Sequence, residues 1–175
     1  IMILEFDNCD LRYDVQSVCL LFFPREPFSE EQGKRLKVSL FSDCAEALFL
    51  WNGRSFREQE PFDPQEFDSV RTVVKRAVYQ VLRQATGKDS AWGIVTGIRP
   101  ANLYEKLFSR FGADARRIFE ERYFVSPEKT DLCVSVLQGR KKAVSLLEKE
   151  SSSLYISVPF CPSRCRYCSF VSAST

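Results

Sequence analysis

The chain has 175 residues, a hydrophobic fraction of 45% and a net charge of +2, which suits one packed domain, or one domain and part of a second. So small a net charge argues against binding to nucleic acid or to an anionic membrane by bulk electrostatics. Histidine is absent, which excludes Ser-His and Cys-His nucleophile pairs and a Cys3His zinc site within the chain. No apolar run reaches the ~18 residues that a transmembrane helix needs.

The first third of the chain has the pattern of a β-sheet. Met2–Phe6 and Val15–Phe23 are short apolar runs of strand length. Arg35–Ser42 alternates apolar and polar residues, which is typical of a half-buried strand. Ala47–Trp51 is followed by an Asn-Gly pair, which favours a tight hairpin turn. Short strands with tight connections predict an antiparallel sheet.

The middle of the chain has helical patterns. Phe67–Ala85 carries apolar residues at helical spacing, and Gly87 supplies a C-terminal stop. A second helix is expected to begin at Pro100, because proline suits a first helical turn. Asp114 and Ser126 are suitable N-cap residues for two more helices. The second of these is expected to run to about residue 150.

A serine run, Ser151–Ser153, is the best linker candidate in the chain. It separates the last predicted helix from a new apolar strand, Leu154–Val158. The predicted architecture is therefore an α+β domain over residues 1–150, with an antiparallel sheet followed by helices. Residues 151–175 are expected to begin a second domain with one strand and a loop.

Three cysteines, Cys161, Cys165 and Cys168, follow that strand with C-x3-C-x2-C spacing. Three thiolates can hold three irons of a four-iron cluster and leave the fourth iron open for chemistry. Arg164 and Arg166 lie between them, and cationic neighbours favour the thiolate form that metals require. The spacing therefore favours a [4Fe-4S] cluster with an open iron.

Other interpretations of the cysteines explain less. A disulfide would leave the third motif cysteine unpaired in a chain that has no secretion signal. A closed zinc site needs a fourth ligand, which would have to come from the four remaining cysteines, and these lie mostly in or beside apolar stretches: Cys9, Cys19, Cys44 and Cys133. The odd number of cysteines, seven, favours a reducing, cytoplasmic location.

The residues around the cysteines carry a longer pattern. Residues 154–170 read Leu-Tyr-Ile-Ser-Val-Pro-Phe-Cys-Pro-Ser-Arg-Cys-Arg-Tyr-Cys-Ser-Phe, which resembles oxygen-independent coproporphyrinogen III oxidases (coproporphyrinogen dehydrogenases) of the radical S-adenosylmethionine superfamily. Residues 92–107 read Trp-Gly-Ile-Val-Thr-Gly-Ile-Arg-Pro-Ala-Asn-Leu-Tyr-Glu-Lys-Leu, which is similar to a bacterial branch of that family with an N-terminal domain of this size. Ser157 stands where the family usually has a histidine.

The resemblance implies a complete set of site residues and cofactors. Cys161, Cys165 and Cys168 would bind a [4Fe-4S] cluster whose open iron takes S-adenosylmethionine, with Tyr155 and Tyr167 near the cofactor. A 5′-deoxyadenosyl radical would then start the decarboxylation of coproporphyrinogen III propionates to vinyl groups in haem biosynthesis. The implied partners are this porphyrinogen and an electron donor.

The resemblance also implies that most of a (β/α) barrel is missing from the chain, since a closed barrel takes ~200 residues or more. We therefore expect an N-terminal fragment that is catalytically inactive alone. A haem-binding chaperone relative and a module that docks an electron donor or partner subunit are the alternatives. Radical modification of tRNA is disfavoured by the low charge.

One feature lies outside the cysteine motif. Thr96, Gly97 and Arg99 precede the helix expected at Pro100, and a helix N-terminus is a natural place for an anion. The blander interpretation, which we favour from the sequence, is a turn at Gly97 with Arg99 paired to a nearby carboxylate.

Overall fold

The structure, a computed structural model, describes residues 1–28, 33–62, 69–97, 99–147, 152, 154–161 and 173–174. It divides into two compact units, Ile1–Arg140 and Lys141–Thr175, which are described separately. The first unit contains a four-stranded sheet followed by helices, so the predicted α+β class is confirmed. The boundary predicted between residues 150 and 151 stays a prediction.

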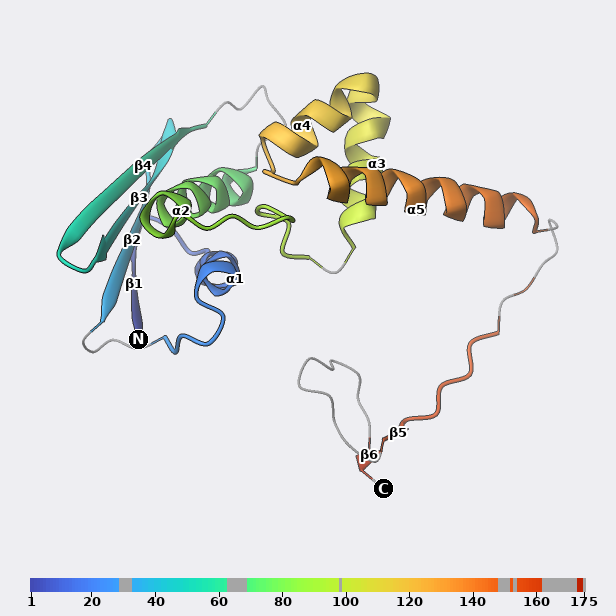
Figure 1. The fold of residues 1–175 in the computed structure, drawn as a ribbon, viewed down its shortest axis with the longest axis horizontal. Coiled ribbons are helices and arrows are strands. Elements are labelled where there is room, and N and C mark those ends of the chain that lie inside the picture. The colour runs from blue at the N-terminus through green and yellow to red at the C-terminus, as the bar shows by residue number, and fades with distance from the viewer. Residues whose placement is uncertain are drawn as a thin grey trace. The chain divides into compact units, whose positions relative to one another are not determined.

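The sheet of the first unit has the strand order β1-β2-β3-β4 (Figure 1). Its strands are β1 (Met2–Asp7), β2 (Lys34–Leu40), β3 (Cys44–Trp51) and β4 (Arg54–Pro61). β2 pairs with β3, and β3 with β4, in antiparallel fashion. The predicted turn at residues 52 and 53 joins β3 to β4, and both turn residues have positive φ, as a tight hairpin turn requires.

The first strand pairing differs from the prediction, because β1 runs parallel to β2 and the sheet is mixed. Parallel neighbours need a crossover connection, and helix α1 (Arg12–Phe22) supplies it. The strand predicted over Val15–Phe23 is therefore wrong. Its buried side chains are Val15, Val18, Cys19 and Phe22, which recur at the three- and four-residue intervals of one helix face.

β4 lies at the edge of the sheet, and its residues carry no strand pattern in the sequence. Its side chains are mostly polar and exposed, so its backbone pairing with β3 holds it in place. Glu60, near its end, is buried and pairs with Arg76 at 2.9 Å. This ion pair ties the edge strand to the helix that covers the sheet.

The remaining helices begin close to where the sequence predicts them: α2 (Val70–Thr86), α3 (Pro100–Phe111), α4 (Ala115–Glu121) and α5 (Pro127–Ser145). α5 ends at Ser145, before the residue 150 that the sequence suggested. Gly87 ends α2 in the left-handed conformation, and Ser126 Oγ accepts the backbone N–H of Lys129 at 3.4 Å at the start of α5. Asp114 occupies the N-cap position of α4 after a short 3-10 turn, Gly112–Asp114, but makes no side-chain cap. Its carboxylate contacts Arg117 instead, at 3.3 Å.

The core of the first unit lies between the sheet and the helices that cover one of its faces. Helix α2 packs against β3 and β4, and α1 packs against α2 (Figure 1). The ring of Tyr79 meets Phe22 edge-on and stacks on Phe124, with centroid separations of 5.2 Å in each case. These contacts hold the α4–α5 connection, which contains Phe124, against helix α2. Among the described residues, no helix combines the length and apolar character needed to cross a membrane.

The second unit contains the end of α5 and the cysteine segment. The strand predicted over Leu154–Val158 is not formed, and these residues have no regular secondary structure. A strand is stable only when its backbone groups pair with a neighbour, and none of the described residues pairs with them. Two short parallel strands follow, β5 (Phe160–Cys161) and β6 (Ala173–Ser174). Most of the predicted linker falls outside the described residues.

Candidate functional site

Cys161 is the first cysteine of the motif and lies in β5 with an exposed, free thiol. The ladder pairs Cys161 with Ser174, and paired strands lie about 4.8 Å apart. Cys161 and Ser174 therefore lie side by side, and the other two motif cysteines lie between them in sequence. Cys165, Cys168 and Tyr167 themselves lie outside the described residues, so their roles stay predictions.

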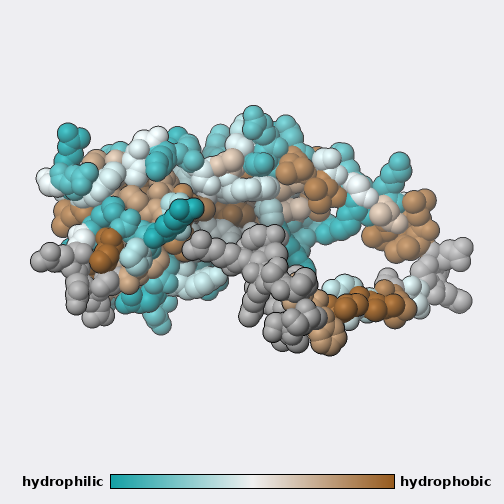
Figure 2. All heavy atoms as spheres, turned by 60° about the horizontal axis from the view of Figure 1, so that its bottom comes forward, coloured by the Kyte–Doolittle hydropathy of each residue, from teal (hydrophilic) through white to brown (hydrophobic). Residues whose placement is uncertain are grey.

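Tyr155 lies six residues before Cys161 in sequence, and its side chain is 82% exposed. Its neighbours Leu154, Ile156 and Val158 are exposed to a similar degree. Figure 2 shows brown, apolar side chains at the end of α5 and along the segment that follows it. Consecutive exposed apolar residues are typical of a surface that another part of a protein covers. The cofactor role of Tyr155 stays a prediction.

The four cysteines outside the motif are poor metal ligands. Burial is the main cause that raises the pKa of each of these thiols, and for Cys19 the pKa rises to about 12. A raised pKa keeps a thiol protonated, whereas iron and zinc bind the thiolate. In the part of the chain that the structure describes, no three Cys, His, Asp or Glu side chains are grouped to hold a metal ion.

The Trp-Gly-Ile segment at residues 92–94 has a structural role that the sequence did not reveal. Gly93 has a φ of +51°, and a Cβ there would lie 2.0 Å from the backbone oxygen of Tyr123. The backbone N–H of Ile94 donates to that same oxygen at 3.0 Å. The segment is therefore held against the α4–α5 connection by a backbone contact that only glycine allows. This contact fixes the start of the loop that leads to Arg99 and α3.

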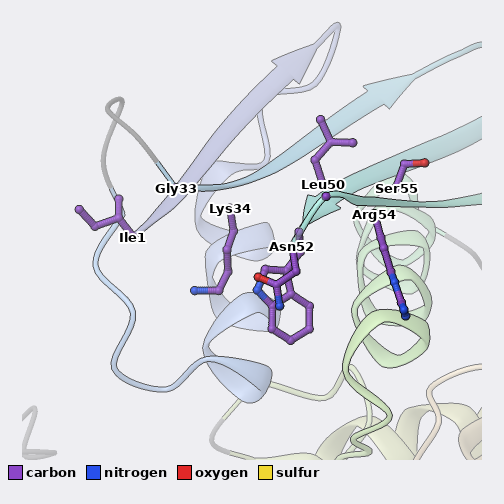
Figure 3. Close-up of a pocket in the computed structure, with 9 residues that line it drawn as sticks. Ile1, Gly33, Lys34, Leu50, Asn52, Arg54 and Ser55 are labelled. Atoms are coloured by element: carbon purple, nitrogen blue, oxygen red, sulfur yellow. The ribbon is translucent and has the colours of Figure 1, made fainter.

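One cavity of the first unit, of about 650 Å³, lies at the end of the β3–β4 hairpin (Figure 3). Lys34 lines it beside Asn52, but its ammonium is already paired with Glu26 at 2.8 Å. No acid, cysteine or histidine is among the described residues that line it, so it offers neither a general base nor a metal ligand. A smaller cavity lies beside Lys75 in α2. The sequence pattern of this helix indicated packing in the core and no site.

The chain is similar to part of a known protein. Over 112 residues, which are 62% of this chain, it is 33% identical to the "oxygen-independent coproporphyrinogen-III oxidase-like protein HemZ" of Bacillus subtilis (strain 168). The match covers 22% of HemZ, so the chain spans about a fifth of the length of that relative. No family model matches the chain, and no solved structure matches it. The sequence is thus related to a coproporphyrinogen-III oxidase-like protein over part of that protein's length.

Proposed function

We propose that this chain carries the cluster-binding segment of a radical S-adenosylmethionine enzyme of the oxygen-independent coproporphyrinogen III oxidase type. The observation that carries the proposal is the C-x3-C-x2-C motif in a chain that is 33% identical over 112 residues to a coproporphyrinogen-III oxidase-like protein. In this proposal the first unit is an accessory domain, and the substrate belongs to the complete enzyme.

The donor chemistry of the chain fits an iron–sulfur cluster. Cys161 presents an exposed thiol, and Cys165 and Cys168 follow it at the spacing that lets one loop hold three irons. Cys19, in contrast, is buried and its pKa is raised to about 12, which keeps that thiol protonated. A [4Fe-4S] cluster with S-adenosylmethionine, when bound, supplies the one-electron chemistry that starts hydrogen abstraction from a substrate.

The residues beside the cysteines are proposed to form one wall of the cofactor site. Tyr155 and Tyr167 would contact S-adenosylmethionine, while Leu154, Ile156 and Val158 would be covered by the rest of the enzyme and exclude water. Ser157 stands in the place of the usual histidine of this family, so contacts made by that histidine must come from another residue. Coproporphyrinogen III is the proposed substrate, and an external electron donor is required.

Cluster assembly on the 175-residue chain tests the proposal. Anaerobic reconstitution with ferrous iron and sulfide is expected to give about four irons per chain and the EPR signal of a reduced [4Fe-4S] cluster. Cys161→Ser is expected to lose most of this iron, because a three-cysteine site has no spare ligand. Cys44→Ser is the matched control, since it also removes one partly accessible thiol but leaves the motif intact.

Two results would contradict the proposal: full iron content in Cys161→Ser, or equal loss in both variants. A separate arm adds S-adenosylmethionine and dithionite to the reconstituted chain. No methionine release is expected, because the chain spans about a fifth of its relative and a cofactor-holding barrel takes ~200 residues. Release of methionine would show that the chain alone is active.

A further inference from the structure

A second cavity, of about 180 Å³, lies in the first unit between α2 and the loop before α3. Three cations line it, Arg71, Lys75 and Arg99, together with Thr96 and Gly97. No acidic side chain is among the described residues that line it. At ~30 Å³ per water molecule, the cavity has room for about six waters. This suits one phosphate or carboxylate group better than a large ring.

Lys75 is the central cation of this cavity. Its Nζ donates a hydrogen bond to Thr96 Oγ1 at 2.8 Å, and the hydroxyl oxygens of Thr96 and Ser17 lie 3.2 Å apart. Burial lowers the pKa of Lys75, and the nearby carboxylate of Asp14 partly offsets this effect. The ammonium is therefore held in place by a neutral partner, in a position where water only partly solvates it.

The carboxylate near Lys75, that of Asp14, already forms an ion pair. Asp14 is mostly buried and pairs with Arg71 at 3.2 Å, so it balances one of the three cations. Within the described part of the chain, neither Lys75 nor Arg99 has a carboxylate within ion-pair distance. The carboxylate partner expected for Arg99 from the sequence is thus not found among these residues. Two positive charges remain for a ligand to satisfy.

The backbone adds to this charge in a secondary way. Helix α3 begins beside the cavity with Arg99 at its N-cap position, and it has no side-chain cap. Helix α2, in contrast, is capped by Ser69, whose side chain accepts the N–H of Thr72. Pro100 has no N–H, and the N–H of Asn102 donates to the carbonyl of Arg99 at 3.1 Å, so this helix start contributes little. Its partial positive charge has the same sign as Lys75 and Arg99.

We propose that this cavity binds an oxyanion, a carboxylate or a phosphate group of a small molecule. Lys75 and Arg99 neutralise the charge, and the Thr96 hydroxyl sets the position of Lys75. Charge-assisted hydrogen bonds from Lys75, which is partly desolvated, and from Arg99, which is exposed, supply the affinity. The site lies wholly in the first unit, and the proposal does not depend on the cluster or on the proposed function.

Titration of the ¹⁵N-labelled 175-residue chain tests this site. Inorganic phosphate and acetate are added in separate series, with chloride used to hold the ionic strength constant. Saturable amide shifts are expected at Thr96, Gly97, Arg99 and Ala101. Arg99→Gln is expected to weaken binding by roughly tenfold, as loss of one charge-assisted hydrogen bond does. Lys75→Gln, tested separately, is expected to weaken it at least as much.

Lys106→Gln is the matched control, because Lys106 is exposed on the same helix and its substitution removes the same charge. It is expected to leave the affinity within about twofold, since exposed charges at a distance are screened. Saturation by phosphate alone assigns a phosphate-bearing ligand, by acetate alone a carboxylate, and by both a general oxyanion site. Absence of saturable shifts with either anion, or equal weakening by Arg99→Gln and Lys106→Gln, would overturn the proposal.

Discussion

The two units of the chain use apolar residues in opposite ways. In Ile1–Arg140 the core fully buries large aromatic side chains, including Phe49 in β3, Tyr79 in α2 and Phe119 in α4. In the second unit the apolar side chains between residues 154 and 158 are 75–85% exposed. The first unit therefore gains its stability from its own packing, whereas the second carries apolar surface that nothing in the described residues covers.

The cysteines divide in the same way. Cys19 and Cys133 are buried in the first unit with raised pKa values, so they act as small apolar side chains. Cys161 is exposed in the second unit. The same residue type thus serves packing in one region and is available to a ligand in the other. Changes in each region should accordingly have different consequences.

The largest expected difference comes from truncating apolar side chains in the two units. Phe119→Ala is expected to lower the free energy of unfolding by about 3–5 kcal/mol, because a fully buried ring leaves a cavity. Ile156→Ala is expected to change it by less than about 0.5 kcal/mol, because that side chain is exposed. Urea denaturation followed by circular dichroism measures both values. A comparable loss in both variants would show that the second unit packs as tightly as the first.

A smaller contrast is expected between two glycines. Gly93→Ala is expected to destabilise the chain by at least about 2 kcal/mol, because its Cβ would collide with backbone at Tyr123. Gly139→Ala, in an exposed turn of α5 with open space around it, is expected to stabilise by up to about 1 kcal/mol through helix propensity. Urea denaturation followed by circular dichroism again measures the free energy of unfolding of both variants. If Gly93→Ala is as stable as wild type, the close backbone contact is not required.

The smallest expected effect is a loss of folding stability at alkaline pH. Burial, with the hydrogen bond to Asp89, raises the pKa of Tyr79 from 10.0 to about 12. The folded state then keeps a proton that the unfolded state has lost, so this contribution is full below pH 10 and is lost as pH rises toward 12. Burial of Cys19 acts in the same direction from pH 9 upward.

Tyr79→Phe is expected to cost about 1–2 kcal/mol at neutral pH, because it removes a hydroxyl that donates to the Asp89 carboxylate and accepts the backbone N–H of Ser90 at 2.9 Å. The decline in stability between neutral pH and about pH 11 should be shallower in this variant than in wild type. Tyr13→Phe, at an exposed tyrosine, should leave both the stability and its pH dependence unchanged. An equal slope in all three proteins would be inconsistent with the raised pKa of Tyr79.

The sequence was most informative where one side-chain pattern has one structural meaning. The helical spacing over α2, Pro100 at the start of α3, and the Asn-Gly turn were all recognisable. It failed at α1, where the run Val15–Phe23 is apolar enough to suggest a strand, although its buried residues follow a helical interval. It missed β4 because an edge strand is held by backbone pairing, which side chains do not reveal.

The two candidate sites, the cysteine motif and the cation cavity, also differ in how far the sequence alone reveals them. The cysteine motif is a local spacing, so the sequence alone predicted it, and its assignment awaits the cluster assay. The cation cavity joins residues that lie far apart in sequence, Lys75 and Thr96, through a hydrogen bond of 2.8 Å. Only the fold brings them together, through the Gly93 contact that sets the course of the loop before α3.

Hydrogen exchange of the iron-free chain tests most directly whether the first unit is self-supporting and the cysteine segment uncovered. Amides of Val73–Leu82 in α2 should exchange only through global unfolding, while those of residues 154–158 should exchange at the rate of an unstructured chain. Cys161→Ser should leave the protection of α2 unchanged. Strong protection of residues 154–158, or loss of α2 protection in Cys161→Ser, would contradict this account.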